Sequence, residues 1–148
     1  MAHPFIQHLE KDHEEQREIG KKLKEAKGAE ERKKLRQQFH EALLPHVEGE
    51  EASIFDYMQN AGGKAREEAL KALQEHHVAE VVLRELMELS LDGDVFSAKA
   101  YVLDELNRHH MEEEETTHFP MLEEMASKAK IDELFEQYKE TEKAVEKK

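Results

Sequence analysis

The stretch HVEGEEASIF at residues 46–55 decides the fold, because a version of it, HMEEEETTHF, returns at residues 110–119. At a constant offset of 64 residues, His46, Glu50, Glu51 and Phe55 return as His110, Glu114, Glu115 and Phe119. Residues four apart on an α-helix lie within about 40° of each other around its axis, so each histidine shares a helical face with its glutamate. The repeat predicts two matched helices that each present His-x-x-x-Glu on one face.

The rest of the chain also favours helix. Glycine and proline are sparse, and Ala, Glu, Lys, Leu, Gln and Arg dominate between them. The expected helices run over about 4–28, 29–61, 64–90 and 94 to beyond 117, with a short amphipathic helix from about Ile131. Four long helices joined by short turns predict an all-α, up-down-up-down four-helix bundle with a short C-terminal helix.

Individual residues refine these helices. We expect Asp94 to cap the fourth helix, Pro45 to kink or split the second, and Pro120 to bend the fourth. An uninterrupted helical period places Tyr57 and Met121 on the inward faces of the second and fourth helices.

The composition fits one domain over 1–148, with the bundle over about 3–127 and the C-terminal helix and tail over about 130–148. Acidic residues number 35 against 22 basic ones, and the net charge of −13 argues against nucleic acid and anionic membranes as partners. No apolar run is long enough to span a bilayer and the N-terminus does not resemble a secretion signal, so we expect a cytoplasmic protein. Because cysteine is absent, any metal site must use His, Asp and Glu.

Two further histidines, His13 and His76, each follow an acidic residue. Periodicity places both near the core-facing side of their helices. Four histidines and two glutamates buried without partners would be strongly disfavoured, and a metal site resolves that conflict. The predicted ligands are therefore His13, His46, Glu50, His76, His110 and Glu114. The preceding acids, Asp12 and Glu75, could accept the outer N–H of a ligating imidazole on a neighbouring helix.

Imidazole and carboxylate ligands suit two transition-metal ions, with iron favoured over manganese and zinc, whereas Ca²⁺ and Mg²⁺ seldom use imidazole. If Glu50 and Glu114 each bridge both ions, every ion has about four protein bonds. That number leaves room for an oxo or hydroxo bridge and for an exogenous ligand. Gly20 and Gly49, on inward faces, either leave space for a small molecule or allow close helix packing.

In this order the motifs resemble the hemerythrin-like, or HHE cation-binding, domain family over essentially the whole chain. The resemblance implies a four-helix bundle around a non-haem di-iron site, and the six residues above match the family's ligand positions. Oxygen-carrying hemerythrins have a second histidine in the third helix and an aspartate in the fourth, where this chain has Glu80 and Glu115. The pattern looks more like the branch that contains iron-cluster repair proteins and iron- or oxygen-responsive sensors. Glu80 and His118 are additional candidate ligands.

Two functions follow as alternatives. The first is a binding or sensing protein whose di-iron site takes up dioxygen, nitric oxide or peroxide, or responds to iron. The second is an enzyme that activates oxygen or peroxide, or that repairs iron–sulfur clusters by iron transfer. Cys and Trp are absent and no tyrosine is expected beside the site as a redox relay, which favours the first alternative.

Overall fold

The computed structural model describes residues 2–146, which form helices and no strand. The elements are α1 (Pro4–Glu25), α2 (Ala29–Ala52), α3 (Ile54–Ala61), α4 (Gly63–Glu88), α5 (Asp94–Glu113), the π-helical turn η1 (Glu114–His118), α6 (Phe119–Met125) and α7 (Lys128–Glu146). The all-α fold predicted from the sequence is confirmed. None of the described helices is both long enough and apolar enough to cross a membrane.

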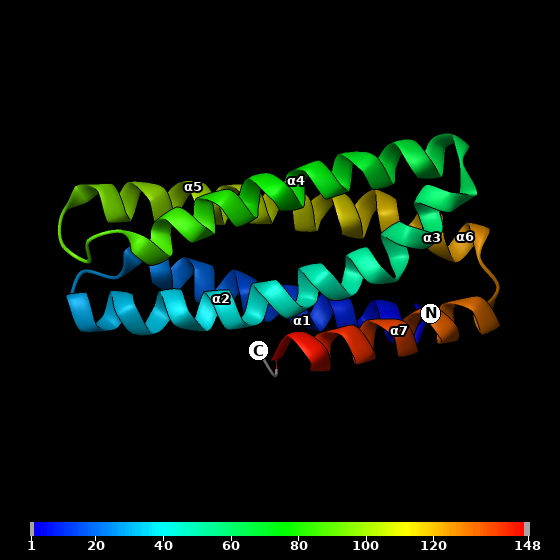
Figure 1. Ribbon diagram of the computed structural model, residues 1–148, viewed down its shortest axis with the longest axis horizontal. Coiled ribbons are helices and arrows are strands. Elements are labelled where there is room, and N and C mark those ends of the chain that lie inside the picture. Colours follow the sequence, from blue (N-terminus) through cyan, green and yellow to red (C-terminus); the bar gives the residue numbers. More distant parts are fainter. Residues whose placement is uncertain (1, 147–148) are drawn as a thin grey trace.

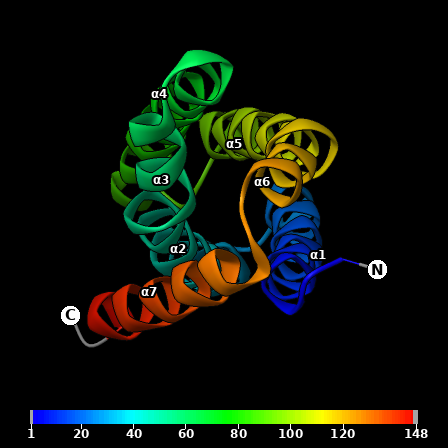
Figure 2. The same ribbon diagram turned by 90° about the vertical axis from the view of Figure 1, so that its right-hand side faces the viewer.

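The long helices run up and down along one axis, with α3 extending α2 and α6 extending α5 (Figure 1). Viewed along that axis, α1, α2, α4 and α5 surround a common interior (Figure 2). α7 lies outside this ring, where it packs along α2 and touches α1. The architecture is thus the expected bundle with one additional helix against its side.

Two apolar clusters fill the interior on either side of a polar layer. One cluster, which includes Phe55 and Phe119, lies at the end of the bundle formed by α3, α6 and α7. The other, which includes Phe39 and Phe96, lies toward the opposite end. Burial of these side chains stabilises both ends of the bundle, so the polar residues between them are held in a rigid setting.

Both helices that carry the repeat are interrupted close to their paired glutamates, at Ser53 in the first repeat and from Glu114 in the second. α2 is not split at Pro45; it continues through this buried proline to Ala52. Ser53 then leaves the helical conformation, with φ −122° and ψ −86°, and its hydroxyl donates a 2.7 Å hydrogen bond to the Gly49 carbonyl. In the second repeat the chain widens into η1 instead, which adds about one residue to the helical turn.

These interruptions change which side chains face inward. A continuous α-helix would turn Phe55 about 140° away from Glu50, and Phe119 equally far from Glu114. Both phenylalanines are nevertheless buried. Tyr57 and Met121 reach the interior less fully than predicted: both are half-buried and pack against the first apolar cluster.

Two helix ends also differ from expectation. The cap of α5 is Gly93, whose φ of 90° suits a residue without a side chain, and Asp94 is the first helical residue. There its carboxylate lies at the positive end of the helix dipole. The C-terminal helix α7 is not short: it spans 19 residues and begins at Lys128 rather than near Ile131. Its length allows it to reach the polar layer.

Candidate metal centre

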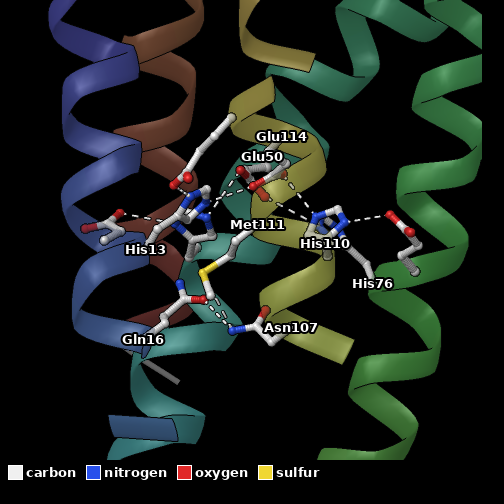
Figure 3. A network of polar contacts seen from close by, with 12 residues as sticks. His13, Gln16, Glu50, His76, Asn107, His110, Met111 and Glu114 are labelled. Atoms are coloured by element: carbon white, nitrogen blue, oxygen red, sulfur yellow. Dashed lines mark hydrogen bonds and ion pairs between the residues drawn. The ribbon is translucent and has the colours of Figure 1, made fainter. Parts of the chain in front are cut away.

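The six predicted ligands converge in the polar layer between the two apolar clusters (Figure 3). They come from α1, α2, α4, α5 and η1, and all are buried. Within the described residues they form two groups, one of His13, His46, Glu50 and Glu114, the other of Glu50, His76, His110 and Glu114. Because both groups contain the same two glutamates, the structure holds two adjacent candidate sites with shared carboxylates.

Each shared carboxylate offers one oxygen to each group. Glu114 places Oε1 2.8 Å from Nε2 of His13 and Oε2 3.0 Å from Nε2 of His110. Glu50 places Oε2 3.2 Å from Nε2 of His46 and Oε1 3.4 Å from Nε2 of His76. Two carboxylates that each reach one imidazole of either group form a donor set suited to bridging a pair of cations.

Hydrogen bonds explain only part of this convergence: Nε2 of His110 lies 2.8 Å from Nε2 of His76 and 3.0 Å from Oε2 of Glu114. Among the described residues, Nε2 of His13, Nε2 of His46, both oxygens of Glu50 and Oε1 of Glu114 are buried and make no hydrogen bond. The 2.8 Å contact between His13 and Glu114 therefore brings two buried polar atoms together without hydrogen-bond geometry. Buried polar atoms without partners cost free energy, and coordination to a cation would satisfy these atoms at once. The residues present therefore fit a metal centre.

The other ring nitrogen of each histidine is held by an acid from a neighbouring element. The four pairs, at Nδ1–oxygen distances of 3.1, 2.8, 2.8 and 2.7 Å, are His46 with Asp12, His76 with Glu51, His110 with Glu75 and His13 with Glu115. Donation of Nδ1–H to the acid leaves the Nε2 lone pair directed at the interior. The contacts predicted for Asp12 and Glu75 are present. Those of Glu51 and Glu115 were missed, although the repeat marks both positions.

The acids also control protonation in the metal-free centre. Burial by itself would lower the pKa of each histidine, but the surrounding carboxylates outweigh burial and raise the pKa of His110 to about 10. The pKa values of His13, His46 and His76 are raised for the same reason. Burial would raise the pKa of Glu114, yet contact with His110 and His13 holds it well below its usual range. Metal binding must therefore displace protons from the imidazoles.

The two additional candidate ligands lie outside both groups. Glu80 is half-buried on the outer side of α4, where it lines a groove with Leu44 and Arg84. His118 is fully buried, 6.3 Å from the ring of His110 and edge-on to Phe55. Burial lowers the pKa of His118, and neither of its ring nitrogens has a hydrogen-bond partner among the described residues. The histidine thus forms part of the wall around the centre.

A tyrosine beside the centre was missed. The hydroxyl of Tyr138, on α7, donates to Asp12 at 2.9 Å and lies 3.0 Å from Nδ1 of His46. The expectation that no tyrosine adjoins the site was wrong, because the sequence does not reveal where α7 docks. A heptad-like helix offers no local signal for such a contact.

Glycine makes this docking possible. A Cβ atom at Gly49 would lie 2.6 Å from Cδ2 of Tyr138, and one at Gly20 would clash with the carboxylate of Asp104. Of the two roles considered for these glycines, close packing is therefore the one observed. Asp104 and Tyr138 fill the space beside these two glycines, so no small molecule binds there.

Comparison with known proteins agrees with the geometry of the centre. The hemerythrin HHE cation-binding domain family matches residues 5–122, a range that includes all six converging ligands and both His-x-x-x-Glu repeats. Comparisons with curated proteins and with solved structures gave no significant match. The chain belongs to the hemerythrin HHE cation-binding family.

Proposed function

We propose that the chain binds two iron ions side by side and uses them to bind or sense a small molecule such as dioxygen, nitric oxide or peroxide, or to respond to iron. One observation carries the proposal: the two ligand groups share Glu50 and Glu114. A single ion would need only one of these groups. Sharing of both glutamates supports a pair of ions held close together.

Different residues would bind the ions, orient the imidazoles and exclude water. The four histidines and two glutamates would hold the ions, and the outer acids would keep each imidazole in the tautomer that exposes Nε2. The apolar clusters on both sides limit access of water. Iron bound in this setting would supply a redox-active Lewis acid with coordination positions open to a small ligand.

Metal analysis tests the proposal. After anaerobic loading with ferrous iron and removal of excess metal, we expect about two iron ions per chain and, after exposure to air, near-ultraviolet absorption that azide changes. The variant with His46→Ala and His110→Ala should lose both properties. The matched control replaces His77 and His109, exposed neighbours of proposed ligands, with Ala. If the wild type retains no metal and a chelator leaves its melting temperature unchanged, the protein is a metal-free interaction module instead.

Tyr138 favours an enzyme as a second candidate. Its buried phenol touches Asp12 and Nδ1 of His46, on the side of the imidazole that faces away from the proposed ion. Loss of an outer partner of a metal-bound histidine costs about 10- to 100-fold in activity, so Tyr138→Phe should reduce peroxide consumption by at least tenfold at unchanged iron content. Turnover by the wild type no faster than that of an equal concentration of free iron would discard the enzyme candidate.

A further inference from the structure

A buried amide layer adjoins the metal centre on the side of the second apolar cluster. Gln16 lies one turn after His13 on α1, and Asn107 lies one turn before His110 on α5. Both amides are buried, with exposed fractions of 1% and 4%. Figure 3 shows them meeting beneath the ligands, next to the side chain of Met111. The layer belongs to neither ligand group.

The amide of Gln16 has a fixed orientation. Asn107 donates its Nδ2–H to Oε1 of Gln16 at 2.9 Å, and the same nitrogen lies 3.9 Å from the sulfur of Met111. Because the oxygen of Gln16 is used in this way, its Nε2 must point to the other side. Figure 3 shows that nitrogen turned toward the histidine layer. The amide therefore turns its NH2 group toward the metal centre.

Those donors have no acceptor within the described part of the chain, since Nε2 of Gln16 is buried and makes no hydrogen bond. An unpaired buried donor lowers stability, whereas a leucine of similar volume would pack there without that cost. Each of the four histidines already has its own acid, and the oxygens of the two shared glutamates would be taken up by the ions. The missing acceptor is thus best supplied by a molecule that enters the centre.

We propose that Nε2 of Gln16 donates a hydrogen bond to the exogenous ligand of the centre and that Asn107 positions this donor. The inference rests on the proposed function, which it narrows to a class of ligand. A fixed N–H donor in a water-poor site stabilises an anion more than a neutral diatomic molecule, because charge strengthens the hydrogen bond. The preferred ligands are small anions with an accepting oxygen or nitrogen, of which peroxide is the example in the proposed function.

Azide serves as the anionic probe, and nitric oxide as the neutral one. In the iron-loaded ferric protein, Gln16→Leu should weaken azide binding about 10- to 100-fold, and Asn107→Leu should weaken it by a smaller factor. Nitric oxide binding to the ferrous protein should change by less than about threefold. Iron content and helical circular dichroism should remain those of the wild type.

Two variants complete the design. Gln16→Asn keeps an amide but withdraws the donor by one methylene group, so it should also weaken azide binding if the leucine variant does not fold. Gln7→Leu makes the same chemical change at an exposed position of α1 and should leave the azide titration unchanged.

Failure of the inference and failure of the proposed function look different. If the wild type holds about two iron ions and binds azide, but both Gln16 variants bind azide equally well, the inference is overturned and the di-iron proposal survives. An equal loss of azide and nitric oxide affinity would also overturn it, because a role in packing would produce that result. If the wild type holds no iron, the proposed function fails first.

Discussion

The two halves of the centre share their ligands but differ in what surrounds them. His46 faces α7, and Tyr138 reaches its Nδ1 across the position of Gly49. Sixty-four residues later the equivalent of Gly49 is Glu113, a partly exposed residue that pairs with His109 on the surface. No helix covers that half among the described residues. The repeat therefore specifies two similar metal positions, and α7 makes them unequal.

The aromatic residues after each repeat show a similar contrast. Phe119 stacks on His13 at a ring distance of 5.7 Å and an angle of 19°, whereas Phe55 meets His76 edge-on at 5.6 Å and 74°. A π-helical turn delivers the first and a helix break at Ser53 delivers the second. Different local devices thus place equivalent residues against the two histidines. The two halves thus keep equivalent ligand positions although the aromatic packing around them differs.

The largest expected effect is the loss of both ions at once. Glu50→Ala removes a ligand from both halves and should leave well under one iron per chain, whereas His76→Ala should leave about one, because it disables a single half. Elemental analysis after desalting measures the difference. Glu48→Ala on the same helix, outside both groups, is the control. Two retained ions in Glu50→Ala would show that the halves are independent.

A pH titration of the metal-free protein tests whether the halves respond alike. The folded-state pKa values of the histidines lie above their unfolded value near 6.5 in both halves, so their contribution to stability is complete below pH 6.5 and is lost as pH rises toward about 10. Carboxylates with lowered pKa values, including Glu114, contribute above about pH 4.5, and that contribution is lost as pH falls.

The metal-free protein should therefore be most stable between about pH 4.5 and 6.5 and should lose on the order of 3 kcal/mol by pH 10. Denaturant unfolding at each pH measures this loss. The iron-loaded protein should not show it, since its imidazoles are held neutral by the metal. Increasing stability of the metal-free protein from pH 6.5 to 9 would contradict the expectation.

Replacing the acids that contact Nδ1 of the histidines compares the iron affinity of the two halves. Loss of such a partner reduces metal affinity about 10- to 100-fold, so Asp12→Asn and Glu75→Gln should both weaken iron binding. Asp12 should show the larger effect, because it also accepts from Tyr138. Competition with a chelator gives the affinities, and Glu112→Gln on the exposed face of α5 is the control. Unchanged affinity in both variants would remove the outer acids from the metal centre.

The smallest effect concerns the packing of α7. A methyl group at Gly49 would overlap the ring of Tyr138, and Gly49→Ala should lower the free energy of unfolding by about 1–3 kcal/mol. Glu113→Ala, at the equivalent position of the second half, should change it by less than about 0.5 kcal/mol, because only an exposed ion pair is lost. Thermal unfolding of both variants measures the contrast, and equal destabilisation would mean that α7 does not distinguish the halves.

The sequence predicted the helices and the convergence of the six ligands because both follow from the 3.6-residue period of the α-helix. His46 and Glu50 share a face by spacing alone, and the repeat extends this to His110 and Glu114. Period failed where the helix is interrupted, so the inward turn of Phe55 was not foreseen. It also failed for α7, because the contact between Tyr138 and His46 joins residues 92 apart and depends on docking. Metal ligation by the six residues stays a prediction that the loading experiments test.

The acid–histidine contacts run in a closed circuit around the bundle, and this has a consequence for assembly. Within the hairpin of α1 and α2, Asp12 orients His46, and within the hairpin of α4 and α5, Glu75 orients His110. The second histidine of each hairpin depends on an acid from the opposite half of the chain. Nδ1 of His13 contacts Glu115, and Nδ1 of His76 contacts Glu51. A hairpin that is not packed against the other would therefore have only one of its two histidines oriented. Cation binding then depends on prior docking of the two hairpins.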